Sequence, residues 1–188
     1  MTDSAKLIVK LHQNLVATSV IPQVYRAIIS HCNKPTGQSY YEYIEDTFGV
    51  SNLPKPLREF VSKHSIKLNK SEPSSFCDVT FLHQLVHILF SDLSNLGSVE
   101  YNQKIQDTNS WEYLLKTAKD NRNQFAHELP ELTDPLWIDN VKSNLEKCLR
   151  MSKDLLSFDQ SELDSHIHEL DSHICAYQRH PVESEWNG

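Results

Sequence analysis

The segment TNSWEYLLKTAKDNRNQFAHE, residues 108–128, decides the fold class of this chain. Its apolar side chains recur mostly at intervals of three or four residues, at Trp111, Leu114, Leu115, Ala118, Phe125 and Ala126. This spacing predicts an α-helix that buries one face. Pro130 follows the segment and is expected to end the helix, because proline cannot continue the hydrogen-bond ladder.

The whole chain has the composition of a helical protein with one core. Its 188 residues are 39% hydrophobic but include only 4 Gly and 8 Pro, too few for a turn-rich all-β fold. We expect an all-α antiparallel helical bundle over residues 1–157, followed by a C-terminal helix and tail over residues 158–188. Residues 1–70 are either part of the bundle core or an N-terminal extension of it.

Capping and turn residues divide the rest of the chain into further helices. Asp3 or Ser4 can cap the first, Pro22 and Pro56 suit first helical turns, and Asp78 suits an N-cap. The expected helices are residues 3–18, 21–32, 39–48, 56–68, 78–93 and 134–156, with a loop at 71–75 and a polar connection at 94–107. The side chains expected to face inward include Leu57, Phe60, Val61 and Ile66, and later Leu136, Val141, Leu145, Leu149 and Leu155.

The tail contains a heptad repeat, in which residues 162–167 recur as residues 169–174. Its apolar seam consists of Leu163, Ile167, Leu170, Ile174 and Tyr177. So short a repeat cannot sustain an independent coiled coil. We therefore expect the seam, residues 163–177, to dock on the bundle, to support a dimer or to bind a protein partner.

The tail also carries histidines among carboxylates. His166 and His173 stand two turns apart, about 10 Å along the helix axis, which is too far for one metal ion. Helix-surface pairs, Glu162 with His166 and Glu169 with His173, explain the pattern instead. We expect no metal site.

Other patterns exclude several protein classes. Cys32, Cys77, Cys148 and Cys175 have no paired spacing, so we interpret them as buried or free thiols in a reducing compartment. The chain has neither a Gly-x-Ser-x-Gly motif nor a glycine-rich phosphate loop, and no cofactor is expected. His83 and His87 are four residues apart but lack the adjacent Glu of metalloproteases, so they are interpreted as amphipathic helix positions.

No apolar run approaches the roughly 20 residues that span a bilayer. Lys10 and His12 interrupt the first apolar run before it could form a signal-peptide core. We expect a soluble protein without membrane association, located in the cytoplasm, with the nucleus as the alternative.

Arg122 and His127 are the residue types that a metal-free RNA-cleaving site requires. Arg can hold a phosphate through paired hydrogen bonds, and His can transfer a proton near neutral pH. In an ideal helix the two stand roughly 140° apart, whereas Asn123 and His127 lie one turn apart on one face. A swing of the Arg side chain, or a second copy of the helix, could therefore complete the site.

The chain resembles the HEPN domain, an all-helical nucleotide-binding or RNase module, in two places. The first is Arg122-Asn123, three residues and His127, followed by a Pro-containing loop and another long helix. The second is Asp78-Val79-Thr80-Phe81-Leu82, which is similar to the Asp-Val-Thr-Leu-Leu helix start in the variant carried by a DAZ-interacting zinc-finger ubiquitin ligase. The resemblance covers roughly residues 20–157.

This resemblance implies a metal-independent endoribonuclease or RNA-binding domain. In that chemistry the 2'-hydroxyl of the RNA attacks its own phosphate and leaves 2',3'-cyclic phosphate and 5'-hydroxyl ends. Arg122 would stabilise the charge on the phosphate, His127 would transfer a proton, and Asn123 would orient His127 or contact the phosphate. Family members commonly form homodimers in which two motifs face one cleft.

The charge balance limits any RNA site to a local surface. With 18 Lys and Arg against 25 Asp and Glu, the formal net charge of −7 repels a phosphate backbone at long range. Lys116, Lys119 and Arg122 recur every three residues and form a basic strip beside His127. The strip is either the RNA-binding surface or an ordinary solvated helix face.

A non-catalytic interaction or scaffold module is the alternative function. On that interpretation Arg122 pairs with Asp120 or Glu128, and the helix dipole stabilises His127. A further alternative is an unrelated helical bundle in which the motif arises by chance.

Overall fold

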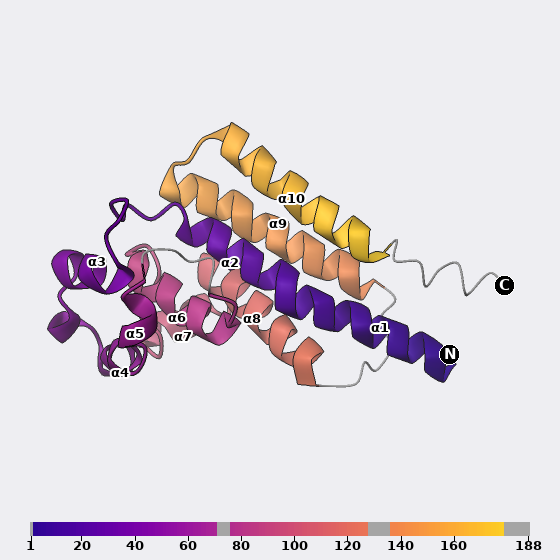
Figure 1. The fold of residues 1–188 in the computed structure, drawn as a ribbon, viewed down its shortest axis with the longest axis horizontal. Coiled ribbons are helices and arrows are strands. Elements are labelled where there is room, and N and C mark those ends of the chain that lie inside the picture. The colour runs from indigo at the N-terminus through magenta and orange to yellow at the C-terminus, as the bar shows by residue number, and fades with distance from the viewer. Residues whose placement is uncertain (1, 71–75, 128–135, 179–188) are drawn as a thin grey trace.

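The computed structural model describes residues 2–70, 76–127 and 136–178, and within these ranges the chain is all-helical without a β-strand (Figure 1). This confirms the predicted fold class. The elements are α1 (Asp3–Leu15), the π-helical turn η1 (Val16–Val20), α2 (Ile21–Ile29), α3 (Tyr40–Thr47), the 3₁₀ turn η2 (Val50–Asn52), α4 (Lys55–Lys63), α5 (Ser65–Leu68), α6 (Val79–Leu89), α7 (Val99–Lys104), α8 (Trp111–His127), α9 (Trp137–Leu156) and α10 (Gln160–Gln178).

The first two predicted helices are one continuous helix. Thr2, and neither Asp3 nor Ser4, is the N-cap of α1, and α1 runs through η1 into α2 without a break (Figure 1). Within η1 the bonding widens, so that the Ile21 N–H donates to the Val16 carbonyl five residues back. Pro22 has no N–H to donate, and a proline ring crowds the carbonyl four residues before it. The wide turn relieves this crowding, which is why Pro22 does not separate the helices.

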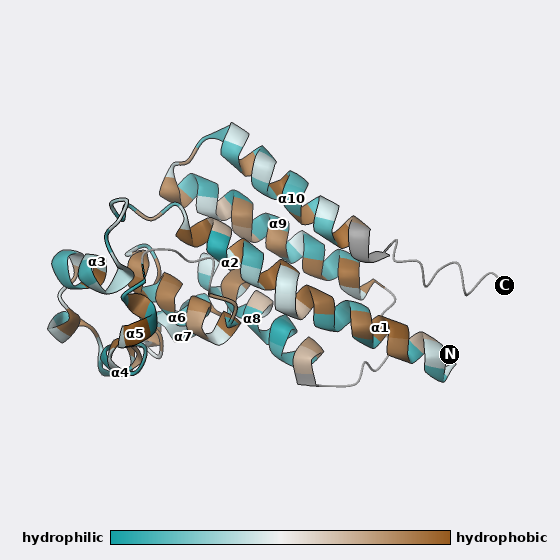
Figure 2. Cartoon of the chain, in the orientation of Figure 1, coloured by the Kyte–Doolittle hydropathy of each residue, from teal (hydrophilic) through white to brown (hydrophobic). Residues whose placement is uncertain are grey.

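A bundle of long helices forms the core. The α1–η1–α2 helix, α8, α9 and α10 lie side by side, and α6 packs against α2 and α8 (Figure 1). Buried side chains from Val16 to Ile174 make one continuous apolar cluster. Figure 2 shows hydrophobic and hydrophilic residues alternating along α9 and α10, as expected for helices buried on one side.

Short helices α3, η2, α4 and α5 gather at one end of the bundle (Figure 1). Ser39 starts α3 with a capping box, in which its hydroxyl accepts from the Glu42 N–H and the Glu42 carboxylate accepts from the Ser39 N–H. The predicted helix 56–68 is broken at His64 into α4 and α5. This break shifts the inward face, so Ile66, predicted to be buried, is 85% exposed, while Leu68 is buried.

The Asp78 cap is confirmed, because its carboxylate accepts from the Thr80 N–H at 2.9 Å. Helix α6 ends at Leu89, before the predicted residue 93. The predicted polar connection at 94–107 contains α7, which begins where the Ser98 hydroxyl accepts from the Tyr101 N–H. Side-chain capping starts this helix, and so short an element shows no apolar period.

Helices α9 and α10 form an antiparallel pair joined at Ser157, which adopts a left-handed backbone conformation with φ 57°. Leu136 and Leu155, predicted on the inner stripe of α9, are exposed because they lie at its ends, where neighbouring helices do not cover them. The predicted helix start at 134–135 and the predicted loop at 71–75 lie outside the described residues.

The heptad seam docks on this chain's own bundle. Leu163, Leu170 and Ile174 are buried and Ile167 is partly buried, because α10 packs on α9, α2 and η1. The Tyr177 side chain lies outside the described part. Docking was one of three predicted roles for this seam. In this arrangement its apolar side chains Leu163, Leu170 and Ile174 are not open to a protein partner.

Candidate functional site

Helix α8 carries the predicted Arg–His motif on its last two turns. The Ser110 hydroxyl accepts from the Tyr113 N–H at 3.0 Å and so starts the helix. Trp111, Leu115, Ala118 and Phe125 are buried and hold one face of α8 in the core, where the Phe125 ring meets the Trp137 ring edge to face. The motif is therefore attached to a rigid element.

Arg122 and Asn123 contact each other directly. The Arg122 guanidinium donates from Nη1 to the Asn123 Oδ1 at 3.2 Å, and both side chains are half-buried. Asn123 was predicted to orient His127 or to contact phosphate, whereas its described partner is Arg122. His127 ends α8, and its side chain lies outside the described part of the structure.

The basic strip is partly neutralised. The Lys116 ammonium lies 2.5 Å from the Asp120 carboxylate. Arg122 forms no ion pair with Asp120, so that predicted alternative pairing is wrong. The other predicted partner, Glu128, lies outside the described residues. Lys119 is half-buried. Burial is the main reason that the pKa of His83 and His87 on α6 is lowered, and the charge of Lys119 lowers it further. The strip thus borders α6 as well as solvent.

Helix α1 brings another cation to the end of α8. The Lys10 ammonium donates to the Phe125 carbonyl at 2.6 Å, close to the C-terminus of α8, where a positive charge is favourable. Sequence reasoning missed Lys10, because 115 residues separate it from Phe125 and nothing in the first helix marks such a contact.

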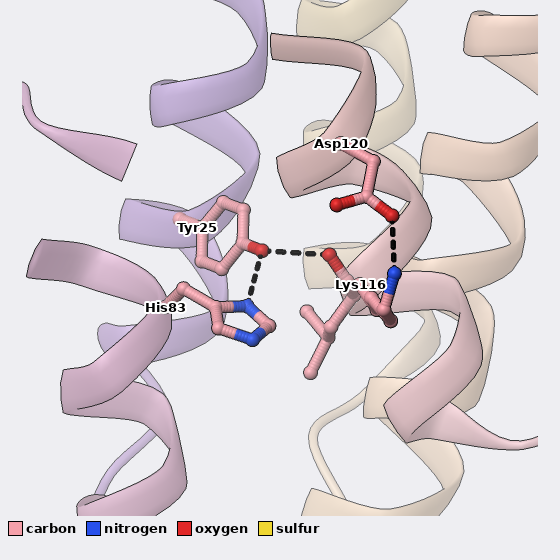
Figure 3. A network of polar contacts seen from close by, with 5 residues as sticks. Tyr25, His83, Lys116 and Asp120 are labelled. Atoms are coloured by element: carbon pink, nitrogen blue, oxygen red, sulfur yellow. Dashed lines mark hydrogen bonds and ion pairs between the residues drawn. The ribbon is translucent and has the colours of Figure 1, made fainter. Parts of the chain in front are cut away.

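Two histidines predicted to be ordinary amphipathic positions are buried in the core instead. His83 is 2% exposed and His87 is 3% exposed. The Tyr25 hydroxyl donates to the Leu115 carbonyl at 2.8 Å, so at its 2.8 Å contact with His83 it accepts from Nδ1–H (Figure 3). The missed signal is α6 itself: it is apolar on nearly every side, so His83 and His87 are buried in the core although they are polar.

His87 has the same tautomer as His83. Its Nδ1 lies 2.9 Å from the Ser94 carbonyl, which can only accept, so Nδ1 carries the proton. The Ser94 N–H and hydroxyl both donate to the buried Glu112 carboxylate, which fixes this loop. Burial lowers the pKa of His83 well below its usual value and lowers the pKa of His87 to about 4, so both rings are neutral at pH 7.

Replacing Tyr25 by Phe should lower the free energy of unfolding by about 1–3 kcal/mol, because the Leu115 carbonyl and the His83 Nδ1–H lose a partner where water is excluded. Urea denaturation followed by circular dichroism measures this change. Tyr41→Phe is the matched control, since Tyr41 is half-buried and its hydroxyl makes no hydrogen bond within the described residues. Equal stability of the two variants would show that the Tyr25 network contributes nothing net.

The tail histidines have a partner that the sequence did not reveal. His166 Nε2 lies 2.9 Å from His31 Nε2, and the His31 ring stacks on Phe158 at 3.9 Å between centroids. The predicted surface pair of Glu162 with His166 is therefore replaced by a contact between α10 and the end of α2. Across the described ranges, no group of three or more His, Cys, Asp or Glu is placed to hold a metal ion.

No family model, curated protein or solved structure matches this chain. In the part that the structure describes, none of the helices combines the length and the apolar character needed to cross a membrane.

Proposed function

We propose that the C-terminal end of α8 is a metal-independent RNA-cleaving site of HEPN type, built from Arg122, Asn123 and His127. The observation that carries this proposal is the state of Arg122. Its guanidinium contacts the neighbouring Asn123 amide and, within the described residues, no carboxylate. An Arg whose charge is not matched by a carboxylate keeps donors for a phosphate.

The chemistry follows from the residue types. The RNA 2'-oxygen attacks the adjacent phosphorus while the bond to the 5'-oxygen breaks, giving 2',3'-cyclic phosphate and 5'-hydroxyl ends. Arg122 binds the non-bridging oxygens, where negative charge grows in the transition state. His127 transfers a proton at the 2'-oxygen or at the leaving 5'-oxygen. Lys10 adds positive charge at the same end of α8.

A second copy of the chain would complete this site. His127 follows Arg122 by five positions of regular helix, which turns their backbone positions roughly 140° apart on α8. Two α8 ends facing one cleft would bring the Arg122 of one protomer to the His127 of its partner. We therefore propose a homodimer as the cleaving species.

A non-catalytic interaction module is the second candidate. It is favoured by the net charge of −7 and by the pairing of Lys116 with Asp120, which together leave little positive surface for RNA. In that role Arg122 would bind an acidic group of a protein partner.

Incubation of the chain with single-stranded RNAs and EDTA tests the first candidate. The parent should cleave, and Arg122→Ala and His127→Ala should each lower the rate at least about 100-fold, the usual contribution of a positioned proton-transfer group or charge stabiliser. Liquid chromatography with mass spectrometry should detect cyclic phosphate ends, and light scattering at micromolar protein should detect a dimer.

Arg150→Ala and His168→Ala are the matched controls, because both residues are exposed on other helices. Each should cleave at the parental rate. No cleavage by a folded, dimeric parent would reject the nuclease in favour of the interaction module, and a strictly monomeric nuclease would reject the shared site.

A further inference from the structure

Residues 55–70, which include α4 and α5, carry positive charge in an otherwise acidic chain. They hold five of the 18 Lys and Arg but only one of the 25 Asp and Glu, so their formal charge is +4, and the rest of a chain at −7 carries −11. The five cations are Lys55, Arg58, Lys63, Lys67 and Lys70. A solvated surface usually mixes both signs, whereas one sign gathered in one place attracts a partner of the opposite sign.

The carboxylates of the neighbouring elements already have partners. Glu59 pairs with Lys55 at 3.8 Å, and Asp78 caps α6. Helix α5 packs against α3, whose acids accept hydrogen bonds within their own region: Glu42 from the Ser39 N–H, Glu45 from the Val50 N–H and Asp46 from the Gln38 amide. Within the described residues, Lys63 and Lys70 form no ion pair. Their charges can therefore attract an anionic group from outside.

The pKa of His64 reflects the positive charge of this surface. It is lowered, first by burial and then by the charges of Lys63 and Lys67, although Asp78 acts in the opposite direction. Lys67 is held in place, because its ammonium lies 4.2 Å from the centre of the Phe81 ring. Positive charge thus prevails around α5.

Ile66 places an apolar side chain among these cations. It is 85% exposed, more than any other large hydrophobic residue in the described part of the chain. Lys63 and Lys67 flank it in the sequence and both act on the His64 ring, and Lys70 follows one helical turn after it. We call these residues the Ile66 patch, which consists of Lys63, Ile66, Lys67 and Lys70.

The aromatic residues beside the patch are not available to nucleic-acid bases. Phe60, Phe76 and Phe81 are each less than 5% exposed. Single-stranded nucleic acids are usually bound on exposed aromatic rings, on which the bases stack. An exposed isoleucine within a rim of cations fits a protein surface better, because apolar contacts inside a charge-complementary rim are typical of protein interfaces.

We propose that the Ile66 patch binds an acidic segment of another protein, in which one apolar side chain stands between carboxylates. The carboxylates contact the ammonium groups of Lys63 and Lys70, and the apolar side chain covers Ile66. Figure 1 shows α4 and α5 at the end of the bundle opposite the start of α1, whereas Lys10 of α1 contacts the C-terminal end of α8. Binding at the patch is therefore independent of RNA cleavage.

Three probes that each carry six negative charges test the proposal: the blocked peptide EDELEDE, the same peptide with serine in place of leucine, and the DNA strand heptathymidylate, which lacks the 2'-hydroxyl needed for cleavage. Titration of the full chain followed by ¹H–¹⁵N NMR at pH 7 should show saturable shifts at residues 62–70 with the leucine peptide. The dissociation constant should be at least about threefold larger for each of the other two probes, since neither covers Ile66 with an apolar group.

Three outcomes would overturn the proposal. Equal affinity of the two peptides would remove the role of Ile66. Equal or tighter binding of the DNA strand would assign the patch to nucleic acid, and no saturable shift up to millimolar leucine peptide would show that the patch binds no such segment.

Variants at exposed positions separate the apolar contact from the charges. Ile66→Ser should weaken the leucine peptide to the affinity of the serine peptide and leave the serine peptide unchanged, as expected when two side chains contact each other. Lys63→Gln with Lys70→Gln should weaken both peptides at least about threefold. The matched control, Lys147→Gln with Arg150→Gln, removes two exposed cations of α9 and should leave binding unchanged. Equal losses in the two double variants would contradict binding at the patch.

Discussion

Acidification from pH 7 to pH 4 should cost this fold about 3 kcal/mol of unfolding free energy through His87 alone, since its pKa falls from 6.5 to about 4 on folding. Below pH 6.5 the unfolded chain gains a proton on this ring, while the folded chain does not until about pH 4. Stability is therefore fully present above pH 6.5 and decreases as the pH falls. Burial of His83 acts in the same direction.

Urea denaturation at several pH values measures this loss, and the comparison with His87→Asn isolates it. The Asn side chain does not titrate, so the difference in unfolding free energy between parent and variant should shrink by about 2 kcal/mol from pH 7 to pH 5. His168→Ala, an exposed histidine, should follow the parent at every pH. A pH-independent difference between the parent and His87→Asn would mean that folding leaves the pKa of the His87 ring unchanged, which would contradict this prediction.

Replacing Leu170 by Ala should lower the unfolding free energy by about 2–5 kcal/mol, because it empties a buried position between α10 and the bundle. For a chain of this size each kcal/mol lowers the melting temperature by roughly 2–4 °C, so a large shift is expected. Thermal unfolding followed by circular dichroism measures it. The matched control is Leu155→Ala at a residue that is 41% exposed, which should shift the melting temperature by much less.

The comparison separates docking from a loosely attached tail. If Leu170→Ala melted like Leu155→Ala, α10 would contribute nothing to the fold, and the seam would be free for another partner. A large shift confined to Leu170→Ala would show that the seam is part of this chain's own core.

The sequence predicted the features that depend on local chemistry. Apolar spacing predicted α8. Side-chain capping explains the helix starts at Ser39 and Asp78. The heptad seam docks on the bundle, which was one of the roles predicted for it. The apolar spacing also placed Arg122 and Asn123 on one helix, with His127 at its end.

What the sequence could not predict are contacts between residues far apart in the chain. Lys10 with Phe125, Tyr25 with His83, and His31 with His166 each join two separate helices, and a one-dimensional pattern does not state which helices become neighbours. The continuity of α1 with α2 was missed for another reason: a proline usually marks a helix start, and only the π turn lets Pro22 follow without a break.

The unbroken helix from Asp3 to Ile29 limits how this protein can be dissected. At 1.5 Å per residue it is a rod about 40 Å long, roughly the width of a small domain. The proposed HEPN-type domain would start near residue 20, so a fragment cut to that boundary would begin at the π turn. Such a fragment would lack the buried Val16 and Ala17 and the Lys10 contact to α8. The shortest unit that can be excised for study must therefore retain the N-terminal helix in full.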